Sequence, residues 1–576
     1  MIKNPLLKIP QRLDVFILAI FTILITLQPY YLRAELNIYE LGLYLPGIDA
    51  ILHGKIPFRD FFHLRGPFEL YMPAFLMKIF GENVAVLSTY FYIGSVLALV
   101  ICVFIAQQFY RTRLFLYLLI PTLVARTFPR VVFTYWGGMR FTVGLLAIFL
   151  AIRFFKRGQL SWIFAAGVLS SCAFFTSIEI GICSLSGIGS ALIFSYLFKI
   201  QERRLAGNAL IVYALGVLVI AVPYSFYLMQ NNAFIPYLTT IYTISTGTSQ
   251  ILDLSALPGN PLEVLLAMLN PAGKIFKNMT PAYLYLILFT YLIFQVRGRK
   301  LEKTHLLLIT IGVYGSVMYA AAFRGIGAAA FEMALQPEKI LFFYLLEEFY
   351  LLLRNQRSKF LSPGYPTSGF LSGLLKLRKI DLMKCFAIIL IGSSLGYSVQ
   401  RFNHRFFVFK FLGNMTRGKD MGDLDPLAGT PSKRLTLERA KGMVVPLSQA
   451  NELEEVAQFI EKNTEPREAV FMFPEIGAYN FIVDRPFVGR FPVGTLTWFN
   501  GNWHHELLAA LEEQKPRYAV LTKNLPEHFE TIYFQKAASK KYYEDVVGFI
   551  RENYHVAAET ADSTIYKLNE VVKAEQ

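Results

Sequence analysis

Long apolar runs alternate with short polar clusters over the first 400 positions of the chain. Runs of about 18 or more apolar residues recur, and this is the length that a helix needs to cross a hydrocarbon core about 30 Å thick. The pattern predicts eleven membrane-spanning helices, at 13–32, 84–108, 113–128, 139–155, 161–178, 183–200, 206–229, 281–297, 304–323, 339–354 and 383–400. The first 401 residues are therefore expected to form a polytopic helical membrane domain.

From about residue 402 the pattern becomes that of a soluble domain. LEEVAQFIEKN, HHELLAALEEQ and YYEDVVGFIREN have the periodicity of amphipathic helices, whereas AVFMFP, RYAVLT and STIYKLN are typical of short strands. FIVDRPFVGRF is interpreted as a strand followed by a turn. Strands that alternate with helices predict a small α/β domain over 402–576. The fold class is mainly α, with this α/β domain appended to the membrane domain 1–401.

Positive charge gives the orientation of the spans. Lys3, Lys8 and Arg12 precede the first span, so the N-terminus is expected in the cytoplasm. The basic clusters of later loops fall on the same side when the spans alternate. Eleven spans then place the C-terminal domain, and the long segment 33–83 after the first span, outside the cytoplasmic membrane.

Composition argues against a soluble protein and against a protein that binds nucleic acid. The chain is 54% hydrophobic and 17% charged, whereas soluble proteins carry about 25% charged residues. The net charge of +15 lies in short loops beside the spans, where it reports orientation and argues against a nucleic-acid partner. The four cysteines lie inside predicted spans without metal-like spacing and are interpreted as small core residues.

Segment 33–83 concentrates the candidate chemistry, and we treat it as the first external loop. Its acidic residues are Glu35, Glu40, Asp49, Asp60 and Glu69. A carboxylate at a membrane surface can take the proton of an acceptor hydroxyl, and partial desolvation raises its pKa toward the useful range. Gly54 and Pro57 are expected to shape a turn between two helices along the membrane surface.

Three motifs in this loop, ELGLY, GKIPFRDF and GPFELY, resemble the first external loop of GT-C class membrane glycosyltransferases. The resemblance is strongest to the protein-mannosyltransferase-like and aminoarabinose-transferase-like families. It places the acidic residues of the family on Glu40 and Asp60. Leu41 departs from the adjacent acid of the family pattern, and Phe58 replaces the commoner tyrosine.

The resemblance implies an enzyme that moves a sugar, with inversion, from a polyprenyl-phosphate-linked donor to a glycan, lipid or protein acceptor. Glu40 would then be the base. Asp60 would assist as a second carboxylate, orient the acceptor or hold a divalent metal ion. His53 and His63 could join such a metal site, but they lack a compact ligand spacing, so a cofactor is left open.

Cations outside the membrane are candidates for the donor phosphate, because they depart from the inward bias of positive charge. They are Arg59, Arg65, Arg126, Arg130, Arg140, Arg324 and Lys339. Arg324 ranks first, since it opens the loop before the tenth span, and Arg126, Arg130 and Lys339 follow. Snorkelling to lipid headgroups accounts equally well for about half of the set.

Further residues are predicted to contact the substrate or to have a structural role. The predicted substrate contacts are Tyr44, Arg59, His63, Glu332 and Gln336. Glu179, at an outer helix end, is interpreted as a capping or interfacial residue, and Glu35 and Asp49 as structural. Segment 230–280 is rich in turn-forming residues, so it is expected to contain few regular elements and to serve as a lid or a flexible connector.

Two other functions are compatible with the layout. A transporter or flippase of lipid-linked sugars would explain the spans and cations, but it predicts functional charges in mid-span and interrupted helices in matching halves. A sensor or assembly protein with an external α/β module would need no Glu40. The clustering of acids in one surface loop favours the glycosyltransferase.

Overall fold

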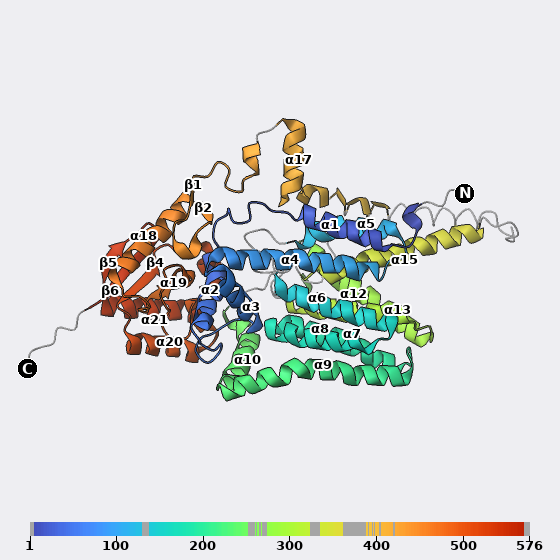
Figure 1. Cartoon of the computed structure of the whole chain (residues 1–576), viewed down its shortest axis with the longest axis horizontal. Helices are drawn as coiled ribbons and strands as arrows, with labels where there is room; N and C mark the ends of the chain where they lie inside the picture. The colour runs from blue at the N-terminus through green and yellow to red at the C-terminus, as the bar shows by residue number, and fades with distance from the viewer. Residues whose placement is uncertain are drawn as a thin grey trace, which may run out of the picture.

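The computed structural model describes residues 5–128, 138–251, 274–322, 334–360, 405–418 and 421–569, with scattered positions in 260–267 and 388–402. Within these residues the molecule is mainly helical. Long helices lie side by side along its long axis, and a smaller region that contains the β-strands is attached at one end (Figure 1).

The first ten predicted spans each coincide with one helix. These helices are α1 (Arg12–Ile25), α4 (Val84–Gln107), α5 (Arg113–Thr127), α6 (Met139–Arg157), α7 (Leu160–Thr176), α8 (Ile178–Leu197), α9 (Arg203–Gln230), α12 (Lys274–Arg297), α13 (Lys303–Ala322) and α15 (Gln336–Phe360). Five helices of the described chain are long and apolar enough to cross a membrane by length and composition alone: α4, α8, α9, α13 and the 279–297 part of α12. The eleventh predicted span, 383–400, lies largely outside the described residues. The protein is a multi-pass membrane protein.

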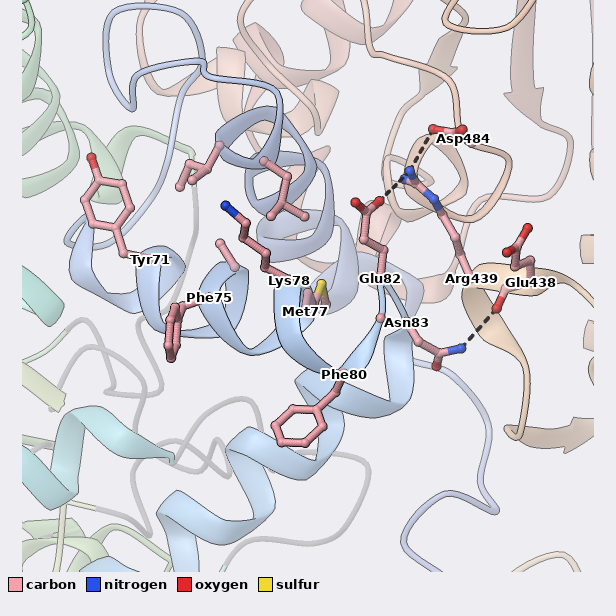
Figure 2. Close-up of a pocket in the computed structure, with 14 residues that line it drawn as sticks. Tyr71, Phe75, Met77, Lys78, Phe80, Glu82, Asn83, Glu438, Arg439 and Asp484 are labelled. Atoms are coloured by element: carbon pink, nitrogen blue, oxygen red, sulfur yellow. Dashed lines mark hydrogen bonds and ion pairs between the residues drawn. The ribbon is translucent and has the colours of Figure 1, made fainter.

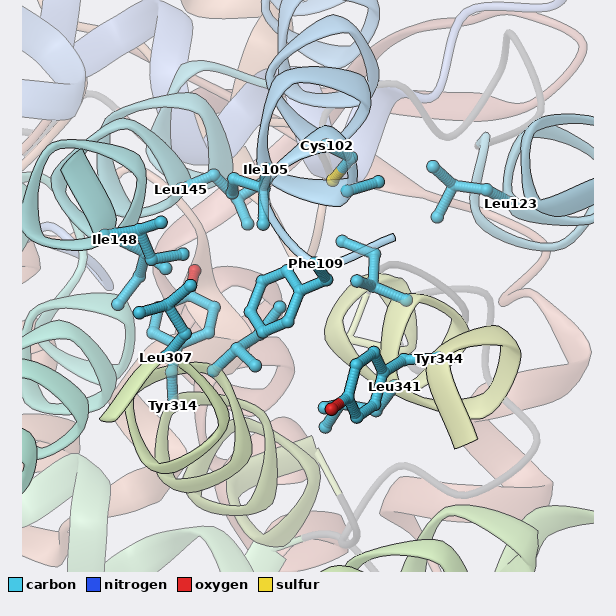
Figure 3. Packing of buried hydrophobic residues seen from close by; sticks show 14 of the residues in the cluster. Cys102, Ile105, Phe109, Leu123, Leu145, Ile148, Leu307, Tyr314, Leu341 and Tyr344 are labelled. Carbon is cyan, nitrogen blue, oxygen red and sulfur yellow. The ribbon is translucent and has the colours of Figure 1, made fainter. Parts of the chain in front are cut away.

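Aromatic and aliphatic side chains fill the centre of this bundle (Figure 3). Phe109, just after α4, packs against Tyr344 of α15 with 5.9 Å between ring centroids. Leu307 and Tyr314 of α13 approach from the other side. Such interlocked packing holds the bundle helices in fixed relative positions, and therefore fixes where their ends lie.

The segment after α1 forms two helices, as the turn residues predict. They are α2 (Ile38–Leu52) and α3 (Phe68–Phe80), and Gly54 has a positive φ of 78° in the connection between them. Both lie at the end of the bundle that meets the strand-containing region (Figure 1).

Segment 230–280 is more regular than predicted. Helix α10 (Phe234–Ile251) begins two residues after Asn232, and Pro236 lies in its first turn, where proline is tolerated. Its side chain Tyr237 is buried against Phe58, whereas Ile235 and Tyr242 are exposed. The turn-forming residues concealed an amphipathic helix, so the expectation of few regular elements is wrong for 234–251.

The C-terminal region is an α/β unit, as predicted. Its sheet has the order β3-β4-β6-β5, in which β3 runs parallel to β4 and the other neighbours are antiparallel. The strands are β3 (Phe471–Phe473), β4 (Tyr518–Thr522), β5 (Tyr554–Glu559) and β6 (Ser563–Leu568), with a separate pair β1 (Ser432–Arg434) and β2 (Val444–Pro446). Its helices are α18 (Leu447–Asn463), α19 (Ala478–Ile482), α20 (Gly501–Gln514) and α21 (Ala537–Asn553), with the short turns η5 (Glu438–Ala440), η6 (Gly494–Phe499) and η7 (Phe529–Tyr533). Helix α17 (Phe407–Arg417) and the short turn η4 (Met421–Leu424) precede this region, and the short turn η1 (Pro5–Leu7) lies before α1.

One prediction for this region is wrong. FIVDRPFVGRF, expected as a strand and turn, contains the end of helix α19 and an irregular segment. Phe481, Ile482 and Val483 are buried in a core that they share with α2. Contact with a helix more than 400 positions earlier in the chain decides their conformation, and the local pattern carries no sign of it.

Candidate active site

Five charged residues gather where several helices begin, and we call them the charged cluster: Glu40, Arg65, Glu69, Arg140 and Glu179. Glu40 lies in the first turn of α2, Glu69 in the first turn of α3 and Glu179 in the first turn of α8. Arg140 is the second residue of α6, and Arg65 precedes α3. The charges of the other four residues all act on Arg65 and on Glu69.

The cluster is largely withdrawn from solvent. Glu40, Glu69 and Arg140 are 5%, 1% and 7% exposed, whereas Glu179 is exposed at the edge. The Arg65 guanidinium lies 3.6 Å from a Glu69 carboxylate oxygen. Buried charges persist in proteins only where opposite charges or dipoles compensate them. The helix N-termini supply such dipoles to the three carboxylates.

Local sequence places Arg65 and Glu69 against the start of α8. Gly66 donates its backbone N–H to the Thr176 carbonyl at 3.2 Å. A Cβ atom at this position would lie only 2.0 Å from the Phe175 carbonyl oxygen, so only glycine allows this approach. The GPFELY motif therefore docks on the α7–α8 corner, next to Glu179.

Arg140 is positioned by the way α6 starts. Gly138 has φ of 77°, a conformation that favours glycine, and its N–H donates to Ser95 Oγ at 3.1 Å. One turn later the Thr142 hydroxyl donates to the Gly94 carbonyl at 2.7 Å. These contacts fasten the start of α6 to α4. Asn37 caps α2 in a similar way, since its side chain accepts a hydrogen bond from the Glu40 N–H at 3.1 Å.

Burial changes the acid–base properties of the cluster. Desolvation raises the pKa of the Glu69 carboxyl group, against the opposing influence of Arg65 and Arg140. Desolvation also lowers the pKa of Arg65, with Arg140 as the second cause. The Glu69 oxygens are buried and accept no hydrogen bond from the described residues. The cluster thus combines carboxylates that can take a proton with guanidinium groups that can bind an anion.

Tyr44 and His63 pack beside the cluster. The Arg65 guanidinium lies 5.4 Å from the centroid of the Tyr44 ring, and the His63 ring lies 5.8 Å from it. His63 is 2% exposed, its Nδ1 lies 3.2 Å from the Leu43 carbonyl oxygen, and burial lowers its pKa to about 3. The imidazole is therefore neutral and supports Tyr44. Contacts of these two side chains with a substrate stay a prediction.

Asp60 and Arg59 hold the connection between α2 and α3 in shape. Both Asp60 oxygens accept hydrogen bonds from Arg59 at 2.8 Å, and one accepts the Ile56 N–H at 2.8 Å. These hydrogen bonds, those from Arg59 first, lower the pKa of Asp60. Arg59 also donates to the Asn231 carbonyl at 3.3 Å. The structure gives both residues a role within the loop, whereas their predicted roles toward substrate are untested.

Some of the remaining residues predicted to contact the donor phosphate or the sugar lie at helix ends, and the others lie outside the described residues. Arg126 lies in the last turn of α5, while Gln336 and Lys339 lie in the first turn of α15, where the Lys339 ammonium pairs with Glu338 at 2.6 Å. The positive charge of Lys339 is thus already balanced. Arg130, Arg324 and Glu332 lie outside the described residues.

The C-terminal region reaches the charged cluster through Tyr39, the neighbour of Glu40. Tyr39 and Tyr533 share a side-chain hydrogen bond. The Tyr533 hydroxyl donates to Glu475 at 3.0 Å, and Nε2 of His528 lies 2.8 Å from the other Glu475 oxygen. This chain of side chains runs from the first turn of α2 to the half-exposed His528. Nothing in the sequence pattern linked these positions.

A second ionic network fixes the far end of α2. Arg439 binds Asp49 at 2.8 Å, Glu82 at 2.6 Å and Asp484 at 2.8 Å (Figure 2 shows the last two). Arg467 adds a contact to Asp49 at 3.0 Å. The network borders a cleft of about 910 Å³ between α3 and the C-terminal region. The structural interpretation of Asp49 agrees with these contacts.

The described residues contain no group of three or more His, Cys, Asp or Glu side chains arranged to hold a metal ion. His53 and His63 each direct Nδ1 to a backbone carbonyl, and Asp60 is bonded to Arg59. These residues do not fit the three-ligand site that a metal at Asp60 would need. A divalent metal cofactor stays a prediction.

The residues chosen from the sequence overlap with this candidate site only in part. Glu40 and Tyr44 were predicted as site residues, whereas Arg65 and Arg140 were only counted among the outer cations. Glu69 had no assigned role, and Glu179 was interpreted as a cap. A signal was present, because all three carboxylates occupy first helical turns, but burial and mutual proximity depend on tertiary packing.

Comparison with known proteins places the fold. No family model matches the sequence, and no curated protein matches it. The structure is similar to crystal structures of ArnT from Cupriavidus metallidurans, one bound to undecaprenyl phosphate and one in the apo state. The first comparison covers 98% of this chain and 99% of that chain, with a TM-score of 0.51 and 12% identity. The second covers 96% and 97%, with the same score and identity. The chain has the GT-C-like fold that its loop motifs led us to expect.

Proposed function

We propose that this protein is an integral membrane glycosyltransferase. It moves a sugar from a polyprenyl-phosphate-linked donor to a glycan, lipid or protein acceptor on the outer side of the cytoplasmic membrane. The observation that carries the proposal is the charged cluster at one end of the bundle, with carboxylates and guanidinium groups in a desolvated site. The fold shared with ArnT, crystallised with undecaprenyl phosphate, supports it.

The guanidinium groups of Arg65 and Arg140 suit the donor phosphate. Guanidinium binds phosphate through paired hydrogen bonds, and its positive charge stabilises the negative charge that develops on the leaving group. Glu69 and Glu179 balance the two arginines when no anion is bound. A low-dielectric site strengthens each of these interactions.

Glu40 is the proposed base. The acceptor hydroxyl oxygen attacks the anomeric carbon and forms the new glycosidic bond, while its proton passes to the Glu40 carboxylate. The bond between the anomeric carbon and the phosphate oxygen breaks, and its electron pair leaves with the polyprenyl phosphate. Attack opposite to the leaving group inverts the anomeric configuration. In this proposal the acceptor reaches the site past Glu179, which is the exposed member of the cluster.

Replacement of the base tests this assignment. Glu40→Gln keeps the size of the side chain but cannot take a proton, so we expect kcat to fall by about 10²–10⁴-fold. The full chain in vesicles would be supplied in turn with polyprenyl-phosphate-linked glucose, mannose, galactose and aminoarabinose, each together with a glycan, a lipid or a protein as acceptor. Released polyprenyl phosphate is the readout.

Glu35→Gln is the matched control, since Glu35 is an exposed acid three residues before α2. We expect it to act like the wild type. A Glu40→Gln variant with wild-type turnover would refute the role of Glu40. Absence of turnover in the wild type with every donor and acceptor would count against the reaction itself.

The transporter or flippase alternative has less support. It predicts functional charges within the membrane spans, whereas the charged cluster gathers at helix starts on one side. We therefore retain the transferase as the proposal.

A further inference from the structure

Helix α17 has two distinct faces. Its sequence is FVFKFLGNMTR, and at 100° per residue Phe411, Met415 and Leu412 share one face with Val408. Lys410, Gly413 and Arg417 lie on the opposite face. A helix with this separation of apolar and cationic residues is typical of segments that lie in a membrane interface.

The apolar face of α17 is exposed in the part of the chain that the structure describes. The helix has no buried residue, and Phe411, Leu412 and Met415 are 37%, 45% and 56% exposed. An amphipathic helix in a soluble domain would bury this face against a core. The α17 helix instead contributes its apolar side chains to the outer surface of the molecule.

Helix α17 lies next to the end of α1, which also carries an exposed apolar surface. Phe407 contacts Tyr30 with 5.7 Å between ring centroids, and Gln28 donates to the Arg405 carbonyl at 3.3 Å. Both contacts lie just beyond the end of α1, whose outward side chains Phe16, Ile20 and Leu24 are exposed along the bundle. The exposed apolar surface of α1 thus continues onto α17.

The direction of α17 matches that location. It lies across the direction of the bundle helices, beside the C-terminal end of α1 (Figure 1). A helix at right angles to spanning helices, and level with their ends, lies along the membrane plane. Gly418 ends α17 with φ of 64°, and the chain then continues to η4, where Asp425 pairs with Arg33.

We propose that α17 is an interfacial helix that binds the outer leaflet of the membrane. Its face of Phe411, Leu412 and Met415 enters the boundary between headgroups and acyl chains, and Lys410 and Arg417 bind lipid phosphates. Because α17 precedes the C-terminal region in the chain, this contact fixes the height of that region above the membrane. The inference is independent of the proposed reaction.

Spin labels on opposite faces of α17 test the proposal in the full chain. Cys102, Cys172, Cys183 and Cys385 would be replaced by alanine, and a nitroxide attached to Leu412→Cys, Met415→Cys or Gly413→Cys. Gly413 is the matched control, because it lies about 200° around the helix from Met415 and an added Cβ meets no atom within 4 Å. The vesicles would contain phosphatidylethanolamine and phosphatidylglycerol.

The collision rates with oxygen and with a water-soluble nickel complex are the readout. At Leu412→Cys and Met415→Cys we expect the ratio of oxygen to nickel collisions to exceed that at Gly413→Cys by at least about threefold. Equal ratios at all three positions would show a helix in water. Low collision rates with both reagents at 412 and 415 would show a protein contact, for example with a second copy. Either result would overturn the proposal.

Discussion

Glu40 and Asp60 lie in the same polar segment, yet their surroundings differ sharply. Glu40 is buried among Arg65, Glu69 and Arg140, whereas Asp60 is bonded to Arg59 and to its own loop. The sequence shows that both are acidic and predicts that both are external, and the resemblance aligns them with a family pattern. It could not show which of them is desolvated, because burial depends on helices far along the chain.

His63 gives a test at the scale of one residue. Burial lowers its pKa from 6.5 to about 3, so the folded protein resists protonation that the unfolded chain accepts. This contribution to stability is complete above pH 6.5 and is lost as the pH falls toward 3. The wild type should therefore lose about 2 kcal/mol from this residue between pH 7 and pH 5.

Thermal unfolding of wild type and His63→Gln in detergent at the two pH values measures this difference. Glutamine can still donate to the Leu43 carbonyl and does not titrate, so the variant should lose less stability than the wild type on acidification. An equal loss in both proteins would show that His63 is not the group responsible.

At the scale of the helices, the sequence predicted most positions but not which helix ends lie together. The pattern of apolar runs predicted ten bundle helices at nearly the observed positions, because long spans have a strong and local signal. It missed α10, where Asn and Pro suggested turns, and it missed that α2, α3, α6 and α8 begin around one site. Packing between helices decides which helices begin near one another. A short stretch of sequence holds no information about that packing.

Gly66 tests how an element is placed. In the Gly66→Ala variant the added Cβ atom would lie 2.0 Å from the Phe175 carbonyl oxygen. The start of α3 must therefore move away from the α7–α8 corner. We expect a loss of stability of about 1–3 kcal/mol. Weaker binding of undecaprenyl phosphate should accompany it, since Arg65 and Glu69 move with the backbone.

Gly189→Ala is the control for this change. Gly189 lies inside α8, and an added Cβ meets no atom within 4 Å. It should leave stability unchanged or slightly raised, because alanine favours helix. If Gly66→Ala matched this control in both stability and binding, the proposed docking would be wrong.

At the scale of the whole molecule, contacts join the membrane domain predicted for 1–401 to the α/β domain predicted for 402–576. Buried residues of α2, such as Leu41 and Tyr44, share one core with Val445 and Tyr479 of the C-terminal region. The Tyr39–Tyr533 and Asp49–Arg439 contacts hold the two ends of α2. The sequence predicted an appended α/β unit. It did not predict that this unit clamps the helix that carries Glu40.

Arg439→Met tests this clamp. It removes the cation that binds three carboxylates, among them the buried Asp49, so we expect a destabilisation of about 3 kcal/mol. Hydrogen exchange should rise in α2 and around 438–446. Lys541→Met, which breaks the exposed pair with Asp545, should change stability by no more than about 1 kcal/mol. Unchanged exchange in α2 of Arg439→Met would contradict the clamp.

Binding of undecaprenyl phosphate to the full chain tests the central claim most directly. The proposed site predicts that the wild type binds this lipid and that Arg140→Gln weakens binding by at least about tenfold, or roughly 1.4 kcal/mol. Arg153→Gln, at the opposite end of the same helix α6, should bind like the wild type. Equal affinity of Arg140→Gln and the wild type, or no binding by the wild type, would contradict a donor-phosphate site at the charged cluster.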